Sequence, residues 1–99
     1  TAIEGGGIYN QISATTTVTS STVSANTAQY GGSIFNQAIL NVRDGSTIGG
    51  AGAGNTATND GGGIYNYVGG TVTVDGSTIS ANAAANGGGI LNRGTLNIQ

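Results

Sequence analysis

The side chains that could carry out acid–base or metal chemistry are few in this chain of 99 residues. The charged residues are four acids and two bases: Glu4, Asp44, Asp60, Asp75, Arg43 and Arg93. The chain contains no His and no Cys, and its only bases are arginines. Acid–base and nucleophilic catalysis depend mostly on His, Cys, Lys or carboxylates paired across a cleft. We therefore expect a protein that is not an enzyme, with no catalytic residues and no cofactor.

Two of the acids recur in one local context, Asp44-Gly45-Ser46 and Asp75-Gly76-Ser77. If these tripeptides stacked at one corner of a repeat, Asp44 and Asp75 could bind a hard cation such as Ca²⁺ through their carboxylates. Asp-Gly is also a common turn dipeptide, and the corresponding Ser20-Ser21 has no acid. We therefore interpret both acids first as turn residues, and as metal ligands only second.

The elements that would position these residues are internal repeats. A six-residue motif of small residues, an Ile, an apolar residue and an Asn begins at positions 5, 31, 61 and 87, at spacings of 26, 30 and 26 residues. A second motif has the form Ser-Thr-Val/Ile, at Ser21–Val23, Ser46–Ile48 and Ser77–Ile79. A third is an alternating β pattern near residues 16–18, 40–42, 72–74 and 96–98. The Gly-rich segment 49–54 explains the longer middle spacing as a solvent-exposed excursion.

Each repeat therefore holds three short strand-like pieces separated by turn residues. Such strands are too short to be stable as isolated hairpins, but coils stacked in register would pair them about 4.8 Å apart. The sequence predicts an all-β solenoid, a parallel β-helix of about four coils of ~26 residues, with three short strands per coil. Residues 1–99 would form a single β-helix segment with coils that start near residues 5, 31, 61 and 87.

Stacking in register predicts continuous columns of like residues. Period-two alternation directs one column of isoleucines inward: Ile8, Ile34, Ile64 and Ile90. Asparagines recur at two turns, where their amides can donate to one neighbouring coil and accept from the other. These two ladders are Asn10, Asn36, Asn66 and Asn92, and Asn26, Asn55 and Asn82. We expect them to have a structural role.

The outward positions of the first motif form a candidate contact stripe: Tyr9, Phe35, Tyr65 and Leu91. We predict that this stripe is exposed. It either maintains the register between coils or provides a contact surface for another chain or a sugar. A threonine column, Thr22, Thr47 and Thr78, leaves ice binding open as a further hypothesis, although its flanking residues are irregular.

The Gly-Gly-x-Ile repeats, with strand pieces such as Val23-Ser24-Ala25-Asn26 and Ile79-Ser80-Ala81-Asn82, resemble known repeats. They are similar to those of bacterial right-handed parallel β-helix proteins, in particular the passengers of polymorphic outer membrane proteins, which are autotransporters. The resemblance covers nearly the whole chain. It implies a right-handed β-helix at the cell surface or secreted, often an adhesin, and it carries over no catalytic residue.

Composition limits the partners. The net charge is −2 and there is no basic patch, so we expect no nucleic acid, and no apolar run reaches membrane-spanning length. The chain starts and stops in mid-coil, so we expect a fragment of a longer chain or a subunit that stacks end to end on itself. We predict a structural or adhesive extracellular solenoid that forms filaments and contacts carbohydrate or a host surface. A polysaccharide-lyase-like enzyme is the alternative, and an ice-binding solenoid comes third.

Overall fold

The computed structural model describes residues 2–99, which fold into β-strands and turns. Equivalent strands of successive coils pair in parallel to form four sheets. One sheet contains β2 (Ile8–Asn10), β6 (Ile34–Asn36), β10 (Ile64–Asn66) and β13 (Ile90–Asn92). The next contains β3 (Thr15–Thr19), β7 (Ile39–Arg43), β11 (Thr71–Asp75) and β14 (Thr95–Ile98). No helix among the described residues is long and apolar enough to cross a membrane.

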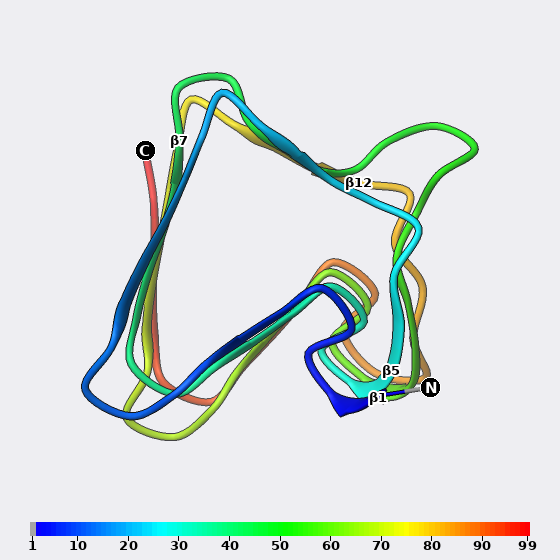
Figure 1. The fold of residues 1–99 in the computed structure, drawn as a ribbon, viewed down its shortest axis with the longest axis horizontal. Helices are drawn as coiled ribbons and strands as arrows, with labels where there is room; N and C mark the ends of the chain where they lie inside the picture. The colour runs from blue at the N-terminus through cyan, green and yellow to red at the C-terminus, as the bar shows by residue number, and fades with distance from the viewer. Residues whose placement is uncertain (1) are drawn as a thin grey trace.

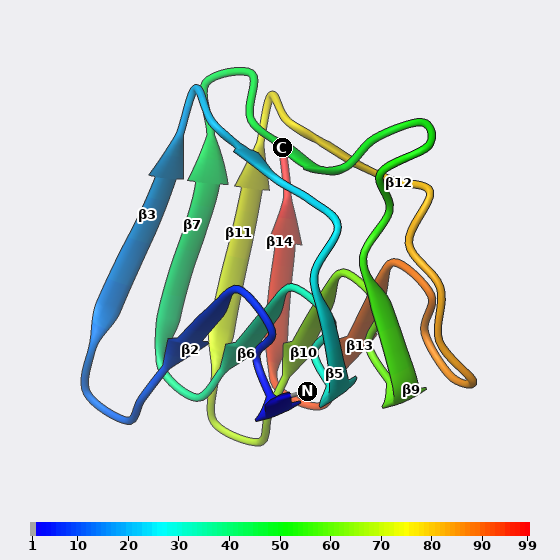
Figure 2. The same ribbon diagram turned by 45° about the vertical axis from the view of Figure 1, so that its right-hand side comes forward.

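The other two sheets complete each coil. The third contains β4 (Thr22–Val23), β8 (Thr47–Gly49) and β12 (Thr78–Ser80). The fourth contains β1 (Ala2–Glu4), β5 (Thr27–Tyr30) and β9 (Thr56–Asp60). In Figure 1 the blue N-terminal coil lies nearest the viewer and the chain runs clockwise as it recedes, which makes the solenoid right-handed; Figure 2 shows the coils side by side. The predicted parallel β-helix of about four coils is confirmed.

The structure differs from the predicted three strands per coil in having a fourth strand, which lies between two of the predicted strand pieces. Residues Thr27–Tyr30 do alternate, with Ala28 fully buried between exposed neighbours. The inward residue is Ala rather than a large aliphatic residue, so the hydrophobic signal of this strand is weak. Ala28 pairs with Ala2 and Ala57 in neighbouring coils.

The interior is a set of aliphatic columns. The register places Ile8, Ile34, Ile64 and Ile90 opposite one another. Ile34 and Ile64, in the two central coils, are fully buried together with Leu40, Val42, Ile48 and Val72. Ile8 and Ile90 pack against this core but are only partly buried, because each has a neighbouring coil on one side. The interior is therefore filled by side chains, and binding chemistry must occur on the outer surface.

Hydrogen-bonded asparagine ladders connect the coils at two turns. In the first ladder, each Nδ2 donates to the Oδ1 of the next coil: Asn10 to Asn36 (2.8 Å), Asn36 to Asn66 (2.9 Å) and Asn66 to Asn92 (2.8 Å). In the second, Asn26 donates to Asn55 (3.1 Å) and Asn55 to Asn82 (2.9 Å). The amides also bond to backbone groups at the turns, as in the Asn55 Nδ2 bond to the Val23 carbonyl (3.0 Å). The ladders therefore satisfy buried polar groups while fixing the register.

A glycine-lined hook makes the cross-section of the coil concave. The first glycine of each motif has a positive φ, between 63° and 69°, which favours residues without a Cβ. At the second position a Cβ would overlap a backbone carbonyl of the next coil, that of Gly62 in the case of Gly32. The chain therefore turns inward before β2, β6 and β10 and then runs outward again (Figure 1). This hook leaves a notch on the outside of the solenoid.

Segment 49–54 leaves the coil between β8 and β9 as the protruding green loop of Figure 1. Its tip, Ala51 and Gly52, is exposed. Asn55 at its end is fully buried in the second asparagine ladder. The loop therefore adds length to the second coil while Asn55 keeps its place in the ladder, and β9 then pairs with β5 with a register shift between Ala28 and Tyr30.

Candidate functional site: an aromatic groove with charged walls

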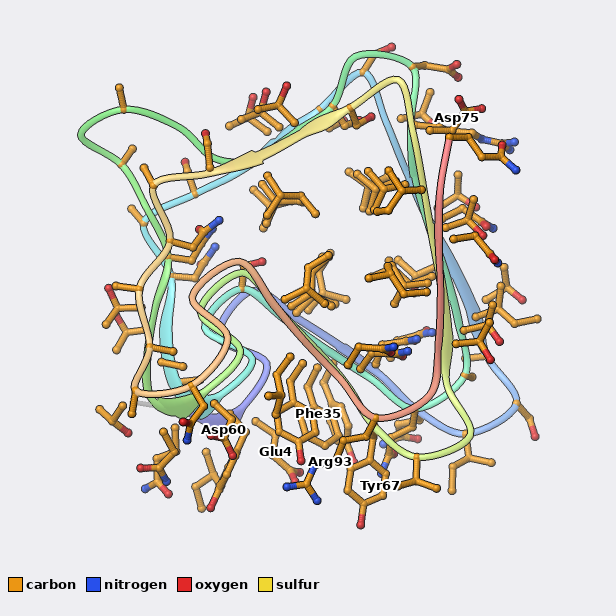
Figure 3. All side chains as sticks on the ribbon, turned by 180° about the vertical axis from the view of Figure 1, so that it is seen from behind. Glu4, Phe35, Asp60, Tyr67, Asp75 and Arg93 are labelled. Carbon is orange, nitrogen blue, oxygen red and sulfur yellow. The ribbon has the colours of Figure 1, made fainter. Side chains whose placement is uncertain are left out.

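The notch formed by the hook contains an open groove of about 280 Å³. Its lining combines aromatic and charged side chains: Glu4, Tyr30, Phe35, Asp60, Tyr65, Tyr67 and Arg93. Figure 3 shows Phe35 inside the notch, with Glu4, Asp60, Arg93 and Tyr67 around its mouth. The lining comes from all four coils. It includes Tyr30 at the end of the first coil, Phe35 in the second, Tyr65 in the third and Arg93 in the fourth. The groove therefore exists only when the coils are stacked.

The floor of the groove is the central part of the predicted contact stripe. The rings of Phe35 and Tyr65 stack with centroids 5.1 Å apart and an interplanar angle of 11°. Tyr9 meets Phe35 edge-on at 5.5 Å. Parallel register places these residues and Leu91 in one column, as expected.

The prediction that this stripe is exposed is wrong for its central members. Phe35 is 2% exposed and Tyr65 is 4% exposed, whereas Tyr9 in the first coil is 44% exposed. The outward face of a strand is normally solvated, but here the hook folds the chain around that face. Tyr30 and Tyr67 then cover the central rings from either side.

Two further tyrosines form the aromatic walls. Tyr30 meets Tyr65 edge-on, with centroids 5.8 Å apart. The Tyr67 ring lies 6.1 Å from Tyr65 and 5.7 Å from Phe35, tilted by about 30° to both. Tyr67 is 42% exposed, so it presents ring surface to solvent while being held by two buried rings.

The charged walls belong to two columns that flank the aromatic one. Glu4, Tyr30 and Asp60 are register partners at the ends of β1, β5 and β9. The Asp60 carboxylate accepts a hydrogen bond from Asn86 Nδ2 at 2.9 Å. On the other side, Tyr67 and Arg93 each follow a ladder asparagine, and the Arg93 guanidinium carbon lies 5.9 Å from the centroid of the Tyr65 ring. That distance is within the range of a cation–π interaction.

Burial and the charges around the groove shift the pKa of the Tyr65 hydroxyl. Burial raises the pKa of Tyr65 above its ordinary value of 10.0, and the positive charge of Arg93 partly opposes this shift. Asp60, Tyr67 and Tyr30 add smaller upward contributions. Tyr65 is therefore held as a neutral hydrogen-bonding hydroxyl over a wide pH range.

Sequence reasoning identified the floor but missed the walls. The missed residues are Glu4, Tyr30, Asp60, Tyr67 and Arg93. A positional signal was present: Glu4, Tyr30 and Asp60 directly precede a glycine motif, and Tyr67 and Arg93 directly follow a ladder asparagine. The residue type changes from coil to coil at these positions, so they do not appear as repeats.

The structure does not place Asp44 and Asp75 opposite each other. Asp75 is the register partner of Arg43, and the Gly45 amide bonds to the Gly76 carbonyl. Asp44 is thus the additional residue of its turn, with a φ of 59°. Within residues 2–99, no three acidic, His or Cys side chains gather as a metal site would require.

The threonine column lies on another face of the solenoid. Thr22, Thr47 and Thr78 are register partners. Two positions further along the strand, Ser80 is opposite Gly49, so the neighbouring column contains no matching hydroxyl array. This face is therefore a single rank of threonines.

Among the described residues, the groove is thus the feature in which aromatic surface, carboxylates and a guanidinium face one space. Such a set can stack on a ligand, accept hydrogen bonds from it and donate to it. No protein-family model, no curated protein and no solved structure matches the chain.

Proposed function

We propose that the chain is a non-catalytic, adhesive structural module of an extracellular surface, in which the β-helix is a rigid scaffold that presents the aromatic groove. The observation that carries this proposal is the groove itself, which is built from residues of successive coils and faces solvent. The interior supports the same conclusion because it is filled with aliphatic columns and asparagine ladders. The resemblance of the repeats to those of surface proteins supports the location.

We also propose that the coils associate along the axis, either with a second copy of the chain or with further coils of a longer one. The three amide-to-amide bonds of the first asparagine ladder all run in one direction, from the donor of one coil to the acceptor of the next. The two faces of any coil are therefore complementary to each other. Such a head-to-tail contact propagates into filaments.

Adhesion can be tested with beads that carry the purified chain. The beads are passed over immobilised extracellular polysaccharides and over intact cells, and their retention under flow is measured. We expect wild-type beads to be retained and Tyr67→Ala beads to be released, because Tyr67 is the exposed ring of the groove. Tyr9→Ala is the matched control, since Tyr9 is similarly exposed but does not line the groove. Retention that is equal for all three proteins would contradict a role for the groove.

Association along the axis has its own test. Analytical ultracentrifugation over a range of concentrations should show growing oligomers, and electron microscopy should show fibres of constant width. A folded monomer at every concentration would contradict self-association of this chain.

A carbohydrate-active enzyme is the second candidate, since Glu4 and Asp60 are two carboxylates that line one groove. Glycosidases use such a pair. This candidate predicts release of reducing sugar from a polysaccharide and its loss in Asp60→Asn, whereas our proposal predicts binding without turnover. If a lyase used Asp75 instead, Ca²⁺-dependent turnover would be lost in Asp75→Ala.

A further inference from the structure

We infer that the aromatic groove binds a neutral sugar residue of a surface or matrix glycan. This inference rests on the proposed adhesive function and names the chemical class of its ligand. It follows from three properties of the groove. An exposed tyrosine ring packs on buried aromatic rings, the walls contain both hydrogen-bond donors and acceptors, and the volume suits a single sugar ring.

The exposed ring is Tyr67. Its packing against Phe35 and Tyr65 fixes its orientation, so little freedom is lost when a ligand stacks on it. The nonpolar face of a pyranose presents C–H groups, which can lie against the face of an aromatic ring. The ring of Tyr30, which is only partly buried, also borders the groove and extends this nonpolar surface.

The polar walls match sugar hydroxyls, which both donate and accept hydrogen bonds. The carboxylates of Glu4 and Asp60 accept, the guanidinium of Arg93 donates, and the tyrosine hydroxyls can do either. Asn86 donates to one oxygen of Asp60, which orients that carboxylate beside the groove. The groove therefore offers both acceptors and donors to a ring of hydroxyls.

The charges favour a neutral ligand over an ionic one. With two carboxylates and one guanidinium, the lining has a formal charge of −1, which disfavours acidic sugars such as uronates. A cationic ligand would compete with Arg93, which already lies over the Tyr65 ring at 5.9 Å. A neutral sugar meets neither obstacle.

The size of the groove limits the ligand and its affinity. A volume of about 280 Å³ is near the lower end of small-molecule sites, which begin at about 300 Å³. One sugar ring is thus the natural occupant, and single-site binding should be weak. Attachment would gain strength from many copies acting together.

The inference can be tested by NMR titration of the ¹⁵N-labelled chain. The probes are the methyl glycosides of glucose, galactose and mannose, and N-acetylglucosamine; glucuronate is the anionic probe and tetramethylammonium the cationic one. We expect at least one neutral sugar to shift the amide signals of Tyr65, Tyr67 and Arg93 in a saturable way. We expect Tyr67→Ala to weaken that binding about ten-fold, and Tyr9→Ala to change it less than two-fold.

Three results would overturn the inference: no groove shift with any neutral sugar, shifts with glucuronate or tetramethylammonium only, or equal losses in Tyr67→Ala and Tyr9→Ala. Spectra of the free variants must show unchanged dispersion, and Tyr67→Phe, which keeps the ring, should retain binding. The bead assay separates the two proposals. If retention depends on Tyr67 while every neutral sugar fails, the sugar inference is wrong and the adhesive function stands. If retention does not depend on Tyr67, the adhesive role of the groove is wrong as well.

Discussion

Removal of one amide from the first asparagine ladder should destabilise the whole solenoid. Asn36 is fully buried in a central coil. Its Nδ2 donates to Asn66 Oδ1 at 2.9 Å, and its Oδ1 accepts from Asn10 Nδ2 at 2.8 Å. The same side chain bonds to the backbone N–H and C=O of Ala38 at 3.2 and 3.1 Å, which closes the turn between β6 and β7.

The cost of Asn36→Ala follows from the groups that lose a partner. Asn66 Oδ1 is left without this donor in a buried site, which costs roughly 2 kcal/mol. The bonds to Ala38 contribute about 1 kcal/mol more. Asn10 Nδ2 keeps its bond to the Ile39 carbonyl (2.9 Å), so it adds little. We therefore expect the free energy of unfolding to fall by about 3 kcal/mol.

Urea denaturation followed by circular dichroism measures this loss, with an unchanged m-value showing that the same surface unfolds. Asn59→Ala is the matched control because Asn59 is exposed on β9, and we expect a change within about 0.5 kcal/mol. The double variant Asn36→Ala/Asn66→Ala should lose less than the sum of the two single losses, because both remove the same bond. If Asn36→Ala cost no more than Asn59→Ala, the ladder would not stabilise the fold as we describe.

Other predictions address the hook, the groove and the turns. Gly32→Ala should cost about 3 kcal/mol or more in thermal or urea unfolding, because its Cβ would overlap the Gly62 carbonyl. Gly69→Ala, where only a φ of +86° opposes the change, should cost about 1–2 kcal/mol. If Gly32→Ala and Gly69→Ala lost the same stability, the close contact between Gly32 and the Gly62 carbonyl would be excluded. The raised Tyr65 pKa means that the folded state holds this proton more tightly than the unfolded state. The contribution of this protonated hydroxyl to stability is complete below pH 10.0 and decreases as the pH rises through the folded pKa. The Tyr65→Phe variant should therefore show a smaller decrease in Tm at alkaline pH than the wild type. A fall as steep as that of the wild type would contradict this. Because Asp75 lies opposite Arg43 rather than Asp44, calorimetry should detect no Ca²⁺ binding that Asp75→Asn removes.

The fold could be predicted because its signal repeats. The inward position of Ile34 and Ile64 carries Ile in every coil, and an asparagine follows it two residues later each time. Repetition turns weak local preferences into a strong pattern. The strand containing Ala28 was missed because a small inward residue gives little hydrophobic contrast.

The candidate site could be predicted only in part. The column of Phe35 and Tyr65 was visible in the sequence, but its burial depends on the inward hook at Gly31 and Gly61. Glycines with a positive φ occur in many kinds of turn. The presence of glycine at these positions therefore does not predict that the chain turns inward. The walls were missed because Tyr67 and Arg93 occupy equivalent positions with unlike residues.

The stacking of coils in register is the claim on which both the fold and the groove depend. Isoleucine-methyl labelling with NOE spectroscopy tests it directly, with Ile34→Val used to assign the central signal. The structure predicts contacts in the order Ile8–Ile34–Ile64–Ile90, and none between Ile8 and Ile64. A direct contact between Ile8 and Ile64, or the absence of one between Ile34 and Ile64, would contradict the stacked β-helix and the groove built on it.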